Sequence, residues 1–359
     1  MKKIPYLLLL ALLALTSSCD KRNTEISIKG DKFCINGVET FKGKSWRGHS
    51  IEGLLPNARV VNGIFEDENP ETSVQWAYPD TGEWDAERNT DEFIAAMEQW
   101  RASGLLAFTI NLQGGSPQGY GNAGWINSAL TPRGELKEPY MNRLERILDR
   151  ADELGMVAIV GIFYFGQSKQ MTSEEDYHAA IRNSVNWILD KGYTNVMVEI
   201  TNECDIKAYG ELGLDVLRNR AAATIALAQS ITKDGRRLLV STSYQGGRVP
   251  SAKVIEQADF ILLHGNGQKK PGALQRMIDK TRQSPSYTSK PVMINEDDNF
   301  RFEADDCNFM VATELGVSWG FFDYRKKGEG FDEGFQSVPV CWGISSERKR
   351  AFFGMISEW

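Results

Sequence analysis

Residues 195–203 read NVMVEITNE, a run of apolar and β-branched residues that ends on an amide and a carboxylic acid. The run is too short for a typical helix, and it lacks the alternation of a strand with one wet face. We therefore expect a strand that is buried on both faces, as in parallel sheets covered by helices. The stretch predicts an α/β fold in which Asn202 and Glu203 stand just beyond the end of that strand.

The same order of strand and then helix recurs along the chain. Seven further strands are expected, at residues 41–46, 105–112, 156–165, 237–243, 259–264, 291–295 and 316–322. Helical patterns lie between or after them, at residues 90–104, 138–155, 173–192, 211–232, 271–283, 301–315 and 346–359. Eight such units in about 320 residues favour a single closed (β/α)8 barrel, the TIM barrel, with an open doubly wound sheet as the alternative.

The N-terminus has the form of an export signal. Lys2 and Lys3 precede an apolar run of about a dozen residues, which is shorter than the roughly 20 that cross a bilayer. Small residues then lead to Cys19, as in bacterial lipoprotein signals, so we expect a lipid anchor at Cys19 in the cell envelope, with plain secretion as the alternative. Residues 1–19 are predicted to be the signal, 20–25 a tether, and 26–359 one domain that begins with a β-hairpin.

Composition excludes several other classes of protein. The formal net charge of -7 and the lack of a basic stretch with interleaved aromatics argue against nucleic-acid binding. Four cysteines follow Cys19 at scattered positions without a CxxC pair, so neither a zinc site nor a disulfide framework is indicated: Cys34, Cys204, Cys307 and Cys341.

A second strand-terminal acid follows in KPVMINEDD, where Glu296 ends the seventh expected strand. In a (β/α)8 barrel the carboxyl ends of all strands meet at one rim, so Glu203 and Glu296 can face each other across the mouth. Cleavage of a glycosidic bond uses such a pair, one carboxyl as a proton donor and the other ionised. Two nearby acids also raise the pKa of one of them.

With these residues the chain closely resembles the clan A glycoside hydrolases, retaining (β/α)8 enzymes that include cellulases and mannanases. The resemblance rests on Asn202-Glu203 after strand four and on Glu296, 93 positions later, after strand seven. It implies that residues 26–359 form a catalytic domain. It further implies that Glu203 is the general acid/base, Glu296 the nucleophile and Asn202 the partner of the sugar 2-hydroxyl.

Other rim residues are weaker candidates for substrate contacts. His264 ends strand six and can orient a carboxylate, and Trp319 in strand eight offers a flat apolar face to a sugar. In the related families such a His contacts the nucleophile and such a Trp forms the floor beneath the sugar. Each also has a purely structural alternative. Further candidates for hydroxyl contacts follow strands two and five: Asn111, Gln113, Ser243, Tyr244 and Gln245.

The long connection over residues 47–89 is acidic and aromatic, and in a barrel it rises from the active face. Trp76, Tyr78 or Trp84 can serve as sugar platforms there, or they can pack within the loop itself.

The chain departs from glycoside hydrolase family 5, the best-known family of the clan. Strand three ends in FYFGQ without a His, strand six gives His-Gly-Asn in place of His-x-Tyr, and Asn111 stands at the end of strand two where an Arg is usual. The family and the substrate therefore stay open.

Two other kinds of site are disfavoured. GYGNAG at 119–124 has the letters of a dinucleotide-binding loop, but Pro132 and Gly134 break the helix that would hold a pyrophosphate. A metal-dependent hydrolase usually needs several His ligands, whereas this chain has three His in all. We therefore expect no cofactor and no metal.

The sequence thus predicts a monomeric, endo-acting, retaining hydrolase of a β-linked polysaccharide or oligosaccharide. The alternative is a non-catalytic barrel lipoprotein that binds glycan for uptake. Carboxyl groups facing each other at about 5 Å favour the retaining enzyme. A much wider separation, or an Arg ion pair that locks one Glu, would favour the binder.

Overall fold

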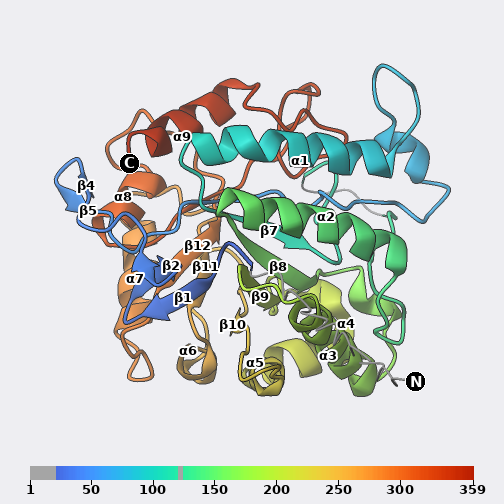
Figure 1. The fold of residues 1–359 in the computed structure, drawn as a ribbon, viewed down its shortest axis with the longest axis horizontal. Helices are drawn as coiled ribbons and strands as arrows, with labels where there is room; N and C mark the ends of the chain where they lie inside the picture. Colours follow the sequence, from blue (N-terminus) through green and yellow to red (C-terminus); the bar gives the residue numbers. More distant parts are fainter. Residues whose placement is uncertain (1–21, 120–123) are drawn as a thin grey trace, which may run out of the picture.

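The computed structural model describes residues 22–119 and 124–359. The expected signal with Cys19, and most of the Gly-rich stretch at 119–124, lie outside these residues. Eight parallel strands form the centre of the molecule, and helices surround them (Figure 1). The strands are β6 (Asn57–Arg59), β7 (Ala107–Asn111), β8 (Val157–Phe163), β9 (Val196–Thr201), β10 (Leu239–Ser241), β11 (Ile261–His264), β12 (Val292–Glu296) and β13 (Gly320–Phe321).

The strands form a closed barrel. Continuous pairing joins them in the order β10-β9-β8-β7-β6-β13, and β11 pairs with β12. Single parallel bridges from Met293 to Ser318 and from Asp297 to Phe321 connect β12 to β13. Between β10 and β11, the amide of Asp259 donates to the carbonyl of Val240 at 3.0 Å. The (β/α)8 prediction is therefore confirmed, and the open sheet is excluded.

The helices follow the strands as the sequence pattern predicts, with some differences in extent. They are α1 (Ala86–Ala102), α2 (Glu138–Leu154), α3 (Glu174–Asp190), α4 (Gly210–Gly213), α5 (Ala221–Ser230), α6 (Ala252–Gln257), α7 (Ala273–Arg282), α8 (Asn308–Glu314) and α9 (Glu347–Ser357). The helix expected over 211–232 is divided by the π-helical segment η4 (Leu214–Asn219).

The ends of two helices explain how their bounds are set. Helix α1 begins at Ala86 rather than at residue 90, because the Asp85 side chain accepts from the Arg88 amide and caps it. Helix α9 lies beside α1 (Figure 1), and the connection after α1 passes close to it. A Cβ on Gly104, which has φ +99°, would lie 2.6 Å from the Ile356 carbonyl oxygen. Only glycine fits there without a shift.

The first barrel strand is β6, so the expectation of a barrel strand at 41–46 is wrong. Residues 45–46 instead form β4 (Ser45–Trp46), which pairs antiparallel with β5 (His49–Ser50). The true strand is only three residues long and carries two polar side chains, Asn57 and Arg59, that are fully buried. Polar residues inside a short strand hide the apolar signal on which the sequence analysis relied.

The predicted N-terminal hairpin is confirmed and closes one end of the barrel. Strands β1 (Ile26–Lys29), β2 (Lys32–Ile35) and β3 (Val38–Glu39) form an antiparallel sheet. Its buried side chains join those of the barrel interior in one apolar cluster: Ile26, Phe33, Leu55, Leu106, Ala107, Val157, Ile159, Met197, Phe260, Leu262 and Met293.

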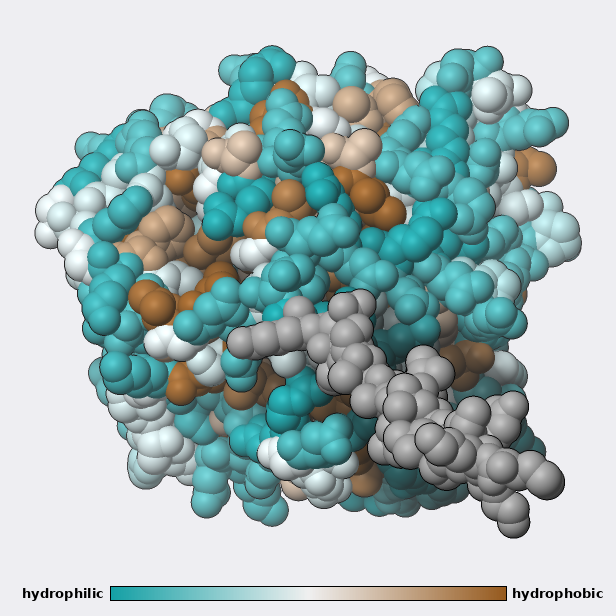
Figure 2. Space-filling view, viewed as in Figure 1, coloured by the Kyte–Doolittle hydropathy of each residue, from teal (hydrophilic) through white to brown (hydrophobic). Residues whose placement is uncertain are grey.

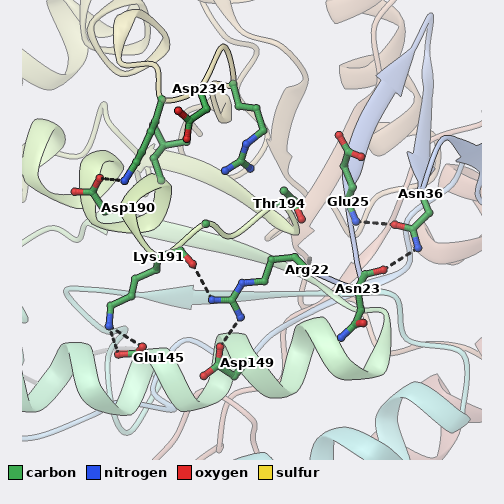
Figure 3. Close-up of a pocket in the computed structure, with 14 residues that line it drawn as sticks. Arg22, Asn23, Glu25, Asn36, Glu145, Asp149, Asp190, Lys191, Thr194 and Asp234 are labelled. Atoms are coloured by element: carbon green, nitrogen blue, oxygen red, sulfur yellow. Dashed lines mark hydrogen bonds and ion pairs between the residues drawn. The ribbon is translucent and has the colours of Figure 1, made fainter. Parts of the chain in front are cut away.

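The described part of the expected tether is fixed in place. Arg22 forms an ion pair with Asp149 at 2.8 Å, and the amide of Thr24 donates to Asp152, both on α2. Figure 3 shows Arg22 beside a polar cavity of about 1050 Å³ that also involves Lys191 and Thr194, next to the start of β9. The chain is therefore docked on the barrel from Arg22 onward.

The surface and the cysteines agree with a globular domain. The face in Figure 2 is mostly hydrophilic, with hydrophobic residues only in small scattered groups. Among the described residues, no helix is long and apolar enough to span a membrane. The four cysteines in this part of the chain are unpaired, and three of them are buried.

Candidate active site

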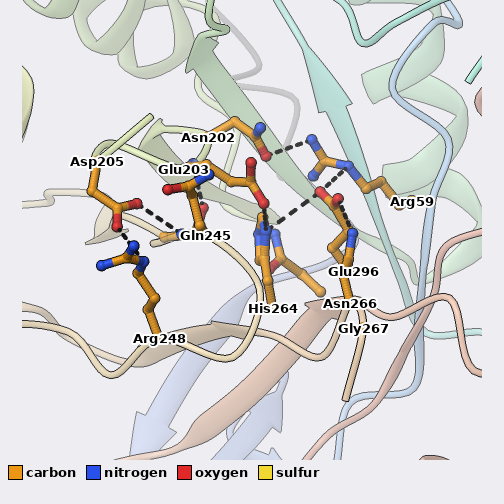
Figure 4. Close-up of polar contacts among 12 residues, drawn as sticks. Arg59, Asn202, Glu203, Asp205, Gln245, Arg248, His264, Asn266, Gly267 and Glu296 are labelled. Atoms are coloured by element: carbon orange, nitrogen blue, oxygen red, sulfur yellow. Dashed lines mark hydrogen bonds and ion pairs between the residues drawn. The ribbon is translucent and has the colours of Figure 1, made fainter. Parts of the chain in front are cut away.

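Two acidic side chains face each other at the carboxyl ends of the strands. Glu296 is the last residue of β12, and Glu203 follows β9 by two positions. One oxygen of each carboxyl and a ring nitrogen of His264 all lie within 4.8 Å of one another. Figure 4 shows both acids pointing toward His264 from opposite sides. The barrel thus brings together the two acids that the sequence singled out.

Glu203 is held in an uncommon backbone conformation. Its φ of 50° lies in the left-handed region, which costs a non-glycine residue on the order of 1 kcal/mol. Two hydrogen bonds to Ser243, which follows β10, maintain it: the Glu203 amide donates to Oγ at 2.9 Å, and the Cys204 amide donates to the carbonyl at 2.9 Å. Strained backbone of this kind is common at functional sites.

His264, at the end of β11, contacts both acids. Its Nδ1 lies 3.1 Å from Glu203 Oε1 and 3.5 Å from Glu296 Oε2. The ring is fully buried. Burial disfavours its charged form, but the nearby carboxylates, Glu296 first, outweigh this and raise the pKa of His264 above its ordinary value.

Arg59 is a candidate functional residue that the sequence patterns did not reveal. This side chain ends β6 and is fully buried, with Nε 2.8 Å from Glu296 Oε2 and Nη2 donating to Asn202 Oδ1 at 2.7 Å. Asn266 also donates to Glu296, at 2.6 Å. A signal was present, since Arg59 stands within the largely apolar stretch LLPNARVV. A buried Arg in such a stretch needs an acidic partner.

A third acid, Glu199, lies inside the barrel beneath the pair. It is fully buried, and Arg59 and His264 each lie 3.9 Å from one of its oxygens. Ser243 donates a short hydrogen bond to Oε1, and Asn295 donates to Oε2 at 3.2 Å. Burial raises the pKa of Glu199, although Arg59 and His264 oppose that effect. Glu199 therefore links Ser243, and with it the backbone of Glu203, to the groups around Glu296.

The sequence-predicted residues Asn202 and His264 lie beside the two acids, whereas Tyr244 and Asn111 do not contact them directly. Tyr244 is nearly buried, and its hydroxyl bonds Ser251 at 3.3 Å. Asn111 is buried in β7, and its side-chain amide has no hydrogen-bond partner among the described residues. Of the weaker candidates, Ser243 bonds the amide of Glu203, while Gln113 bonds the amide of Tyr164.

Trp319 is not the exposed floor that the resemblance implied. The ring is fully buried, and Nε1 donates to Asp297 at 3.0 Å. It packs against Phe302, Phe309 and Phe352, outside the barrel. Because side chains alternate along a strand, Ser318 takes the inward position and Trp319 faces the helices. Its role is therefore in the core.

The aromatic residues of the loop after β6 pack within the loop. Trp76 is buried and donates to Asp67 at 2.6 Å. Tyr78 is also buried and stacks on Trp84, with 5.6 Å between ring centroids. The purely structural alternative holds for Trp76 and Tyr78, which have almost no exposed surface for a sugar.

Glu203, His264 and Glu296 are also the ligand types that bind divalent metals. The charge distribution argues against that use, because the buried guanidinium of Arg59 already lies 2.8 Å from Glu296. A divalent cation placed there would be repelled by Arg59 at close range in a poorly solvated site. The arrangement fits acid-base and nucleophilic chemistry better than metal binding.

Comparison with solved structures finds the same fold in several glycoside hydrolases. No protein-family model and no curated protein matches the sequence. A broad-specificity endoglucanase (GH5-4) from Ruminococcus flavefaciens superposes with a TM-score of 0.57 at 13% identity, over 84% of this chain and 95% of the other. A glycoside hydrolase family 5 protein from Bacteroides vulgatus gives 0.55 at 15%, over 93% and 70%. A β-glucosidase from Thermotoga maritima gives 0.54 at 11%, over 86% and 98%. They share the fold.

Proposed function

We propose that this protein is a retaining glycoside hydrolase that cleaves a β-linked polysaccharide or oligosaccharide, with endo action. The observation that carries the proposal is the close approach of Glu203 and Glu296, within 4.8 Å at their nearer oxygens. Retaining enzymes hold their two carboxyl groups about 5–5.5 Å apart, whereas inverting enzymes leave about 6.5–9.5 Å for a water.

The surroundings of the two acids suit different roles. Glu296 has the guanidinium of Arg59 and the side-chain amide of Asn266 against its oxygens, so two donors fix its orientation. Glu203 has no Arg or Lys partner among the described residues, and its side chain is 12% exposed against 7% for Glu296. Glu296 therefore suits the nucleophile, and Glu203 suits the group that exchanges protons with the leaving group and water.

The reaction takes two steps. A Glu296 oxygen attacks the anomeric carbon and forms an ester bond, while the glycosidic bond breaks and its oxygen takes the proton of Glu203. Glu203, now ionised, then removes a proton from a water, whose oxygen attacks the anomeric carbon. The ester bond breaks, and the electron pair returns to Glu296. Asn202, fixed by Arg59, is placed to bind the sugar hydroxyl next to the reacting carbon.

The competing function is a non-catalytic glycan-binding barrel. The ion pair between Arg59 and Glu296 was the feature expected to favour it. In this site the ion pair argues less strongly for a binder, because Arg59 also fixes Glu296 and Asn202 beside Glu203, as a positioned nucleophile requires. The two functions are separated by whether the protein releases new reducing ends.

The test is a panel of β-linked polysaccharides assayed for reducing ends, with Glu296→Gln and Glu203→Gln. We expect each variant to lose on the order of 10³-fold or more in kcat, because each removes a group that acts in the transition state. A matched control is Glu347→Gln, at an exposed acid on α9, which should keep full activity. A sugar fluorinated at C2 should leave a glycosyl group on Glu296, detectable by peptide mass spectrometry.

Near wild-type turnover of Glu296→Gln would overturn the assignment. Binding without turnover by the wild-type protein, equal in both variants, would instead support the glycan-binding barrel.

We further propose that the enzyme acts as a monomer in the cell envelope, anchored through a lipid on Cys19. Radiolabelled fatty acid incorporation by wild type and not by Cys19→Ser tests the anchor.

A further inference from the structure

A second cavity, of about 840 Å³, lies beside the mouth of the barrel and is strongly basic. We call it the basic groove. Its lining includes five cationic side chains from η4, α6, α7 and the loop after β10: Arg218, Arg248, Lys253, Arg276 and Lys280. Among the described residues of the lining, Asp205 is the one acid. This concentration of positive charge contrasts with the net charge of -7 for the whole chain.

Most of this charge is not paired with an acid in the part of the chain that the structure describes. Asp205 is almost buried and pairs with Arg248 at 3.2 Å. No ion pair involves the other four cations within residues 22–119 and 124–359, and all four are exposed. Like charges that share a cavity repel one another. An anion that enters the groove reduces this repulsion and so lowers the free energy of the protein.

The basic groove adjoins the loops that carry the proposed active-site residues. Asp205 follows Glu203 by two residues and accepts from the Gln245 amide at 2.8 Å, and Figure 4 shows Arg248 beside them. On the other side, the Gly247 amide donates to the His264 carbonyl at 2.9 Å. The loops that form one wall of the groove are therefore the loops that hold Glu203 and His264.

We propose that the basic groove is a subsite for an anionic group on the glycan, either the carboxylate of a uronic acid or a sulfate ester. This inference rests on the proposed hydrolase function and names its substrate class. A saccharide bound at Glu203 and Glu296 would extend over residues 245–247 and bring a neighbouring sugar to Arg276 and Lys280. A nucleic acid is less suitable, because Tyr244, the aromatic residue in the lining, is nearly buried and unavailable for stacking on bases.

The experiment compares anionic polysaccharides with their neutral counterparts, prepared by carboxyl reduction or desulfation. We expect wild type to have a kcat/KM about five- to tenfold higher on one charged form, and this preference should shrink in high salt. A preference for the uronic-acid polysaccharides assigns the groove to a carboxylate, and a preference for the sulfated polysaccharides assigns it to a sulfate ester. The double variant Arg276→Gln/Lys280→Gln should lose most of the preference. Its matched control is Arg350→Gln/Lys42→Gln, which removes two exposed cations outside the groove and should retain it.

Equal rates on charged and neutral forms, or equal preference in the two double variants, would overturn the inference while leaving the hydrolase intact. If nothing is hydrolysed, calorimetry decides on the groove alone: charge-dependent binding of the anionic saccharides that Arg276→Gln/Lys280→Gln abolishes supports it. Tighter binding of phosphatidylglycerol vesicles or DNA than of any saccharide, lost in the same variant, would overturn it.

Discussion

The two ends of the barrel bury different kinds of side chain, apolar at one end and charged at the other. At the N-terminal end, Phe33 and its apolar neighbours fill the interior and the hairpin covers them. At the other end the interior holds Arg59, Glu199 and His264, all fully buried, beneath a strained Glu203. Burying charges costs free energy that apolar packing does not. Packing at the apolar end therefore stabilises the fold. At the other end, holding charged side chains in fixed positions costs part of that stability.

The largest expected effect is at Arg59. Replacement by Met leaves Glu199 and Glu296 buried without their cation, so we expect on the order of 10³-fold loss of kcat and about 3–5 kcal/mol of stability. Arg59→Lys keeps the charge but loses the planar fork that reaches Asn202, and it should recover stability more than activity. Chemical denaturation and kinetics on both variants measure this. Equal activity in Arg59→Lys and wild type would contradict a positioning role.

At the apolar end the pattern should reverse. Phe33→Ala creates a cavity under the hairpin and should cost about 3–5 kcal/mol of unfolding free energy. Activity per folded molecule should not change, because the cavity is far from the rim. Urea denaturation measures the free energy of unfolding, and kcat at urea concentrations below the unfolding transition measures the activity per folded molecule. A loss of kcat without loss of stability would show that the ends are not independent.

Asp297, adjacent to Glu296, should make stability depend on pH. Burial raises its pKa to about 7, against 3.8 ordinarily, although Trp319 and Asn308 donate to it. The folded state then binds a proton that the unfolded state releases, so stability falls as pH rises from about 4 to 7. We expect wild type to lose about 2–3 kcal/mol between pH 5 and 8 through this group. Asp297→Asn should lack that slope, whatever its absolute stability.

The smallest effect is expected at Ser243. Ser243→Ala removes the acceptor of the Glu203 amide and the donor to Glu199, and should cost about 1–2 kcal/mol. We expect about a tenfold decrease in kcat with a shifted pH profile, because Glu203 loses its fixed direction. Ser243→Thr, which keeps the hydroxyl, is the control. An unchanged pH profile in Ser243→Ala would assign it a merely structural role.

The sequence predicted the barrel and its two acids because long apolar strands and strand-terminal acids are local signals. It missed β6 because that strand is three residues long and half polar, and Arg59 was missed with it. Trp319 was placed on the wrong face because a single residue in a strand does not reveal which side is inward. The basic groove was hidden because its cations come from separate segments between residues 218 and 280 and meet only in the fold.

The loop after β10 carries Ser243, which holds the backbone of Glu203, and also Gly247 and Arg248, which line the groove. A substrate that binds this loop therefore affects the orientation of the Glu203 side chain as well as its own affinity. We expect discrimination between glycans to show in kcat more than in KM. The enzyme would then recognise its proper chain by reacting with it faster, rather than by holding it longer.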